Sequence, residues 1–101
     1  MSTKTEKLHY DKVARMGCIL CRIIFKIKET PCEIHHIRRF GGARKNAPVI
    51  GLCPEHHRGN TGVHGLGHKG FATRYGVDEQ HLLEITNRLL SENASAVFVN
   101  D

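Results

Sequence analysis

The sequence predicts a small α+β domain with a helix at the N-terminus, one β-hairpin and further helices behind it. Three observations lead to this prediction. Two motifs, Cys18-Ile19-Leu20-Cys21 and Cys53-Pro54-Glu55-His56, have the two-residue spacing of zinc-binding knuckles. Three short strand patterns lie between them, and a Gly-rich segment separates the last two. The C-terminal part has the apolar periodicity of an amphipathic helix. We therefore expect an α+β fold stabilised by zinc.

The composition is that of one small soluble domain with a thin core. Of 101 residues 40% are hydrophobic, but there is no Trp and there are only four Phe and two Tyr. Domains of this size are often stabilised by a metal or by disulfides. No segment approaches the roughly 20 apolar residues of a membrane span, and no apolar run follows the N-terminus as in a secretion signal. We therefore expect a cytoplasmic protein whose four cysteines are metal ligands rather than disulfides.

The first expected element is a helix over residues 5–16. Its apolar residues follow a loose helical spacing, and Gly17 would provide the C-terminal cap. The knuckle at residues 18–21 follows directly. Residues 23–28 are then predicted to form a short strand, which Pro31 would end.

The next two elements form the predicted β-hairpin. Residues 33–38 are predicted as a strand that carries the adjacent His35 and His36. The polar, Gly-rich residues 40–46 form the connection, and residues 49–52 are predicted as the return strand.

Helices are expected in the remainder of the chain. A short helical piece follows Cys53, and a second helix is predicted over residues 67–75. Asp78 is a candidate N-cap for a third helix. The tail beyond Ser91 is expected to be frayed, although residues 97–99 could add an edge strand or pack on the core. The apolar face of the third helix comprises Leu82, Leu83, Ile85, Leu89 and Leu90.

The two knuckles are expected to bind one structural zinc ion, because closed zinc sites have four ligands. The four candidates are Cys18, Cys21, Cys53 and His56. Cys32 could replace His56, but it has no partner at knuckle spacing and is interpreted as a small buried hydrophobic residue. The alternative, in which these cysteines are ordinary buried residues, stays open.

Two pairs of adjacent histidines point to a second metal. Consecutive side chains diverge by about 100° on a helix and point to opposite faces of a strand. Each pair is therefore expected to serve two tasks. His56 can face the structural zinc while His35 and His57 hold another ion, and His36 beside it can act as a base.

The segments Glu33-Ile34-His35-His36-Ile37 and Leu52-Cys53-Pro54-Glu55-His56-His57 together resemble the ββα-metal core of HNH endonucleases. More narrowly, the run from Gly17-Cys18 to Tyr75-Gly76 resembles the phage recombination-enhancement nucleases, whose best known member cuts DNA held by the RecA recombinase. The resemblance implies one nuclease-like domain over residues 1–101. Its expected parts are an N-terminal arm and helix (1–17), a ββα-metal and zinc-knuckle core (18–76), and a C-terminal helix and tail (77–101).

The resemblance also implies a role for each histidine of the motif. His36 matches the histidine that activates water, which makes it the candidate catalytic residue. His35 takes the place of an Asp or His metal ligand, and His57 matches the final metal-binding histidine of the motif. His56 stands where many relatives have the last zinc-binding Cys. His64 lies in a stretch similar to the one behind the family motif, which makes it a candidate third metal ligand or phosphate contact.

One position departs from the HNH pattern. The central Asn of that pattern usually lies shortly before the Cys of the second knuckle, where this chain has Pro48. Asn46 is close but out of register, and Asn60 lies beyond the motif. No residue is therefore identified that would orient His36, and a backbone carbonyl could suffice.

The implied activity is metal-dependent hydrolysis of DNA phosphodiester bonds. It requires the structural zinc and a catalytic divalent ion, which could be Mg²⁺, Mn²⁺ or Zn²⁺. DNA is the expected partner, and a net charge of +5 suits such a polyanion. A RecA-type recombinase filament is a second candidate partner, in the cytoplasm of a bacterial or phage-infected cell. No membrane partner is expected.

Basic residues near the motif are the candidate contacts with the DNA backbone. For any one of them, a solvated surface charge is the simpler interpretation. His9 and His81 are expected to be exposed, and His68 is assigned no role. Two alternatives stay open: a zinc-stabilised DNA-binding module without cleavage, and a zinc-stapled protein-interaction domain. The basic candidates are Arg38, Arg39, Arg44, Lys45 and Arg58, with Lys69 and Arg74 further along.

Overall fold

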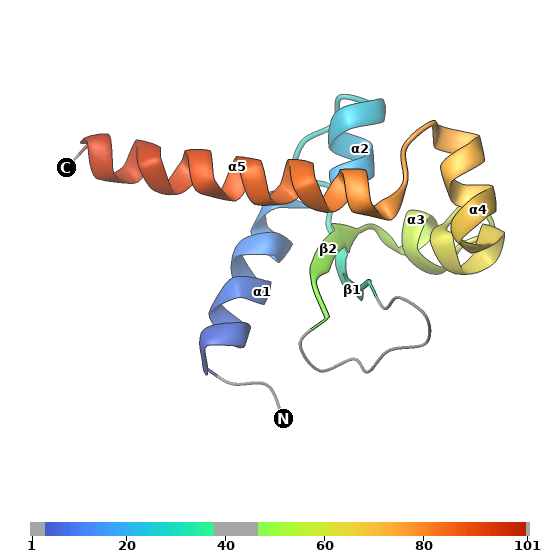
Figure 1. Ribbon diagram of the computed structural model, residues 1–101, viewed down its shortest axis with the longest axis horizontal. Helices are drawn as coiled ribbons and strands as arrows, with labels where there is room; N and C mark the ends of the chain where they lie inside the picture. Colours follow the sequence, from blue (N-terminus) through green and yellow to red (C-terminus); the bar gives the residue numbers. More distant parts are fainter. Residues whose placement is uncertain (1–3, 38–46, 101) are drawn as a thin grey trace.

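The structure, a computed structural model, describes residues 4–37 and 47–100, and the side chains of residues 4–37 and 47–92. Within these residues, helices lie around one two-stranded antiparallel hairpin (Figure 1). The expected α+β class is therefore correct. In this described part of the chain, no helix combines the length and the apolar character that crossing a membrane requires.

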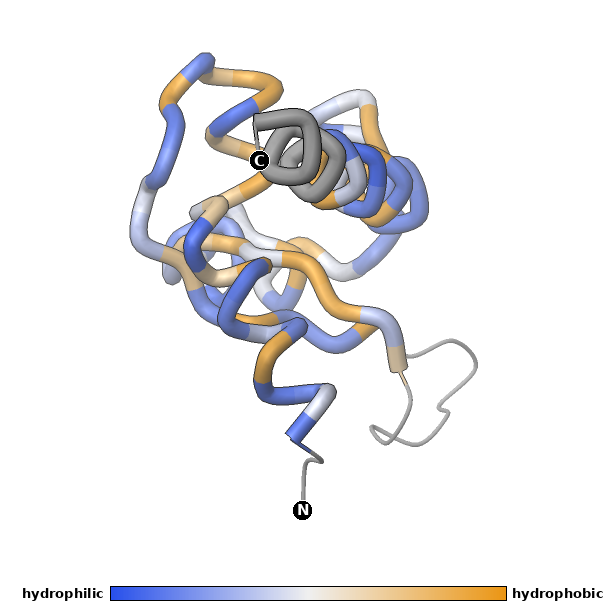
Figure 2. The backbone as a smooth tube through the Cα atoms, turned by 90° about the vertical axis from the view of Figure 1, so that its left-hand side faces the viewer, coloured by the Kyte–Doolittle hydropathy of each residue, from blue (hydrophilic) through white to orange (hydrophobic). Residues whose placement is uncertain are grey.

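Helix α1 (Lys4–Met16) occupies the position predicted for the first helix. Its chain is largely hydrophilic, as the colouring in Figure 2 shows, and only Val13 and Met16 are buried. The helix ends where Gly17 adopts a φ of 79°, the left-handed conformation that suits a glycine cap. This turn brings Cys18 directly to the edge of the core.

The strand predicted over residues 23–28 is wrong. Helix α2 (Ile19–Ile24) includes the first two of these residues, and residues 25–28 are neither helix nor strand. The Cys18 side chain caps its N-terminus, since its Sγ accepts a hydrogen bond from the backbone N–H of Cys21 at 3.4 Å. The apolar run therefore continues a helix begun inside the knuckle. Lys26, with a φ of 60°, then interrupts any extended conformation.

The hairpin consists of β1 (Glu33–His36) and β2 (Val49–Leu52), which pair antiparallel with His35 opposite Ile50. The return strand is as predicted and is buried along its whole length. Strand β1 ends at His36, two residues earlier than predicted. The predicted Gly-rich connection at residues 40–46 lies outside the described residues.

Helices α3 (Pro54–Arg58) and α4 (Val63–Tyr75) follow the hairpin. The predicted helix over residues 67–75 is part of α4, which begins four residues earlier. Gly67 has a non-helical φ of 79° and ψ of 166°, so α4 is kinked there. This kink separates the turn that carries His64 from the turns behind it.

Helix α5 (Glu79–Asn100) is the long helix that crosses the molecule in Figure 1. Asp78 precedes it as predicted, and its Oδ1 accepts a hydrogen bond from the backbone N–H of His81 at 2.8 Å. Leu82 and Thr86 are buried on its inner face. The edge strand suggested for residues 97–99 is wrong, because the helix continues through them.

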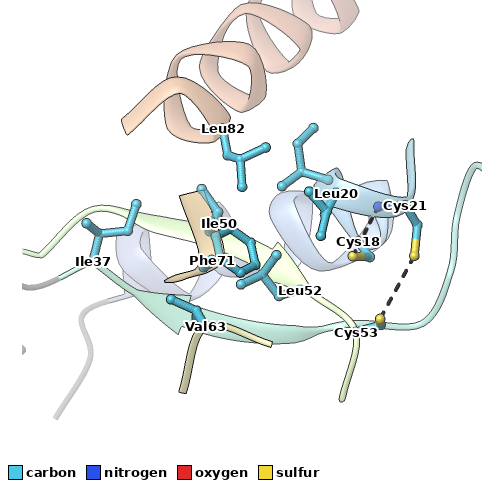
Figure 3. Packing of buried hydrophobic residues seen from close by; sticks show 11 residues of the cluster. Cys18, Leu20, Cys21, Ile37, Ile50, Leu52, Cys53, Val63, Phe71 and Leu82 are labelled. Atoms are coloured by element: carbon cyan, nitrogen blue, oxygen red, sulfur yellow. Dashed lines mark hydrogen bonds between the residues drawn. The ribbon is translucent and has the colours of Figure 1, made fainter. Parts of the chain in front are cut away.

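The core lies between the hairpin and the helices that cover it (Figure 3). Phe71 of α4, Ile50 of β2 and Leu82 of α5 are fully buried and lie together in this cluster. The thiols of the two knuckles are in the same cluster, at one end of the packed aliphatic side chains in Figure 3. The remaining members are Cys18, Ile19, Leu20, Cys21, Ile37, Leu52, Cys53 and Val63.

Gly17→Ala should destabilise the fold by more than about 2 kcal/mol, because it combines a positive φ with a close backbone approach. A Cβ at Gly17 would lie 2.7 Å from the Glu29 Cα and 2.8 Å from the Thr30 N. Gly76→Ala is the matched control, since Gly76 has a φ of 74° with nothing within 4 Å of its Cβ position. Urea denaturation measures both, and equal losses would contradict the predicted clash.

Candidate metal centre and active site

Four buried side chains from two segments form a compact Cys3His cluster. Cys18 and Cys21 come from the start of α2, and Cys53 and His56 from the N-cap and body of α3. The Sγ atoms of Cys21 and Cys53 are 3.9 Å apart. The Nδ1 atom of His56 lies 3.7 Å, 3.5 Å and 3.2 Å from the sulfurs of Cys18, Cys21 and Cys53 respectively.

These separations fit a tetrahedral metal site. Zinc bonds of about 2.3 Å to sulfur and about 2.0–2.1 Å to nitrogen place tetrahedral sulfurs roughly 3.8 Å apart, and sulfur and nitrogen roughly 3.6 Å apart. The distance between the Cys21 and Cys53 sulfurs and the three sulfur–nitrogen distances agree with these values within a few tenths of an ångström. The cluster could therefore bind a metal ion such as zinc.

Electrostatics lead to the same conclusion. Burial raises the pKa of the Cys18 thiol to about 12, and the neighbouring thiols of Cys53 and Cys21 contribute to this rise. Burial also raises the pKa of Cys21, and it lowers the pKa of His56. Without a cation, such sulfurs stay protonated. A divalent ion reverses this preference, because its ligands are thiolates and neutral imidazoles.

Cys32 lies apart from this cluster. Its Sγ donates a hydrogen bond to the backbone carbonyl of Ala14 at 3.6 Å, and the residue is half-buried. The prediction that His56 rather than Cys32 completes the four ligands is therefore consistent with the geometry. Cys32, predicted to be a small buried hydrophobic residue, packs against the core cluster but is only partly buried.

Three histidines form a second cluster beside the first. His35 of β1, His57 of α3 and His64 of α4 place their ligand nitrogens within 4.8 Å of one another. The Nε2 atoms of His57 and His64 are 3.2 Å apart. Two imidazole nitrogens at this distance either share one proton or face a common cation. Burial, and then the neighbouring His57 and His35, lower the pKa of His64, which favours its neutral, metal-binding form.

The two members of each histidine pair lie in different places. His35 is 4% exposed and faces His57 and His64, whereas the half-buried His36 packs edge-on against Tyr10, with ring centroids 5.6 Å apart. His56 faces the cysteines and His57 faces the other histidines. The structure thus separates side chains that are adjacent in sequence.

Two glutamates contact the histidine cluster. Glu33 Oε1 lies 2.8 Å from His57 Nδ1, and Arg58 binds the same carboxylate through Nε at 3.1 Å and 3.0 Å. These hydrogen bonds from His57 and Arg58 lower the pKa of Glu33. Glu79 Oε2 lies 2.5 Å from His35 Nε2, and its Oε1 contacts His68 Nδ1.

Burial raises the pKa of the Glu79 carboxyl, but hydrogen bonds with His35 and His68 outweigh it and bring the pKa below its ordinary value. Neither glutamate was predicted as a site residue. For Glu33 a signal exists, because it shares a strand face with His35. For Glu79 the signal is an acid three residues before Leu82, on the apolar face of α5.

Most of the predicted DNA contacts cannot be placed. Arg38, Arg39, Arg44 and Lys45 lie outside the described residues. The Arg58 side chain is 67% exposed but is paired with Glu33, its Nη2 lying 2.7 Å from Oε2. Further along the chain Lys69 and Arg74 are exposed, as are His9 and His81, the two histidines predicted to be so.

Comparison with known families identifies the class of protein. The chain matches a family of nucleases, enzymes that act on nucleic acid, over residues 2–91. It belongs to the recombination-enhancement, RecA-dependent nuclease family. The narrower of the two resemblances drawn from the sequence is therefore confirmed. No curated protein and no solved structure matches the chain.

Cys18→Ser should lower the zinc content and the melting temperature together, the latter by about 10 °C or more, because one of four buried ligands is lost. Cys32→Ser is the matched control, since Cys32 lies outside the cluster and should leave zinc content unchanged. Native mass spectrometry and thermal denaturation measure both quantities. Full zinc content and a normal melting temperature in Cys18→Ser would show that Cys18 is not a zinc ligand.

Proposed function

We propose that this chain is a metal-dependent DNA endonuclease of the HNH type, which hydrolyses phosphodiester bonds. The observation that carries the proposal is the cluster of His35, His57 and His64, with His36 as the next residue of the same strand. Such a surplus of histidines exceeds the needs of one zinc site. In a family described as nucleases, it supports a catalytic metal rather than a second structural one.

The order of elements supports the HNH assignment. His35 lies on β1, β2 returns antiparallel to it, and α3 follows with His57. The order is therefore β-strand, β-strand and helix, and the first strand and the helix each supply a histidine to the cluster. We further propose that zinc occupies the Cys3His cluster, because that cluster connects the first turn of α2 to the first turn of α3.

Each group of the second cluster has a chemical role in this proposal. A divalent ion bound by His35, His57 and His64 would act as a Lewis acid and neutralise charge on the phosphate and the leaving oxygen. His36 would accept a proton from the attacking water as the new P–O bond forms and the bond to the leaving sugar oxygen breaks. His36 is half-buried, and its ring packs edge-on against Tyr10 of α1.

DNA would be held mainly through its phosphates. A net charge of +5 without any Trp suits backbone contact rather than base stacking. Arg58, one of the predicted contacts, lies near the histidine cluster, because Arg58 and His57 both bind the carboxylate of Glu33. A RecA-type filament carrying the DNA is the partner that the family description suggests.

His36→Ala should reduce plasmid cleavage by about 10²–10⁴-fold while melting temperature and zinc content stay normal, because a general base contributes about that factor. His81→Ala is the control, since His81 is exposed and lies outside both clusters. His57→Ala should also lose activity, but raised metal concentration should recover part of it. Assays with a divalent ion should be run with and without a RecA-type recombinase and single-stranded DNA.

Cleavage by His36→Ala at the wild-type rate would show that another group is the base. If the wild-type protein binds DNA but does not cleave it under any of these conditions, the zinc-stabilised DNA-binding module is favoured instead.

A further inference from the structure

Among the described residues, Glu79 is the one acidic residue that is buried. It is the first residue of α5, is 8% exposed, and lies on the inner face of that helix with Leu82 and Thr86. Its carboxylate lies between the buried His35 on one side and the exposed His68 on the other. The nucleic-acid chemistry proposed above assigns this residue no role.

Burial of the Glu79 carboxylate destabilises the fold unless its negative charge is compensated. A buried carboxylate without partners is destabilising by several kcal/mol. Three features compensate the charge of Glu79: the hydrogen bond with His35 at 2.5 Å, the contact with His68, and the N-terminus of α5, whose dipole favours negative charge. Among the described residues, the two imidazoles are its hydrogen-bonding side-chain partners.

The hydrogen bond between Glu79 and His35 determines which nitrogen of the His35 ring carries the proton. The acceptor is a carboxylate oxygen, so the Nε2 atom of His35 carries the proton that is donated. In a neutral ring, Nδ1 is then the nitrogen whose lone pair can bind a metal. Histidines that bind metals commonly donate their other N–H to a carboxylate, which fixes the tautomer and makes the ring a stronger ligand.

We propose that Glu79 is a positioning residue for the histidine cluster, which holds His35 in the orientation and tautomer that bind a divalent ion. The inference rests on the proposed catalytic metal and deepens it. It assigns a part in metal binding to α5, a helix none of whose described side chains belongs to either cluster.

The second metal-facing histidine supports the proposal independently. His57 donates through Nδ1 to Glu33 at 2.8 Å, and its Nε2 faces His64. Each of the two less exposed histidines of the cluster therefore has its own carboxylate on one ring nitrogen. Arg58 holds the first carboxylate, and His68 contacts the second.

A purely structural role for Glu79 makes a different prediction. If the His35 pair only attached α5 to the hairpin, its loss would lower the melting temperature without a specific effect on the histidine cluster. The two roles are separated by measuring divalent-ion affinity and stability on the same variants.

The test is a titration of the zinc-loaded, full-length protein with Co²⁺ and Mn²⁺, followed by calorimetry and by the Co²⁺ absorption spectrum. Glu79→Gln removes the charge but keeps an acceptor oxygen, and Glu79→Asp keeps the charge on a shorter chain. Glu84→Gln is the matched control, an exposed glutamate on the same helix. Should Glu79→Gln fail to fold, Glu79→Asp is titrated in its place.

Wild type and Glu84→Gln should bind one ion beyond the structural zinc. Glu79→Gln should bind it about 10–100-fold more weakly and Glu79→Asp by an intermediate factor, with zinc content unchanged and cleavage partly restored at high metal concentration. Equal affinity of Glu79→Gln and wild type, or a loss of melting temperature alone, would overturn the positioning role. If wild type binds no second ion, the proposed catalytic metal fails first and this inference fails with it.

Discussion

The Cys3His cluster is the constraint on which the rest of the structure depends. Cys18 and Cys53 are the residues directly before α2 and α3, so a metal held between them would fix where both helices begin. The direction of α3 decides where His57 points, and hence whether it meets His35 across the end of the hairpin. With so few aromatic residues in the chain, a metal bound by this cluster would add to the stability that packing supplies.

Adjacent residues with different tasks follow from backbone geometry. A strand sends His35 into the interior and His36 to its other face, and one helical step separates His56 from His57. The candidate structural site and the candidate catalytic site therefore contain adjacent residues, His56 and His57. A change in the first site should therefore disturb the second, whereas the reverse effect is expected to be small.

Features that depend on a local sequence pattern could be predicted from the sequence. The spacing of Cys18, Cys21, Cys53 and His56, the return strand, and the cap at Asp78 are all local signals, and the structure has them as expected. The predicted strand at residues 23–28 is wrong because the Cys18 side chain caps a helix that begins at Ile19 and runs to Ile24, which composition alone does not reveal. The predicted helix begins too late because Gly67, a typical boundary residue, is an internal kink of α4.

The two carboxylates could not be found in the same way. Glu33 and Glu79 lie 24 and 44 positions from their histidine partners, and such contacts exist only once α3 and α5 are packed on the hairpin. The sequence shows that Glu79 lies on the apolar face of a predicted helix, but it does not show that His35 is its partner.

The most direct test is anomalous diffraction from crystals of the zinc-loaded protein soaked in Mn²⁺. Two separate metals per chain are expected, with zinc bonded to Cys18, Cys21, Cys53 and His56. Manganese should lie between His35, His57 and His64, and His36 should coordinate neither ion. A single metal, or one ion bonded to both His56 and His57, would contradict the division of each histidine pair between two sites.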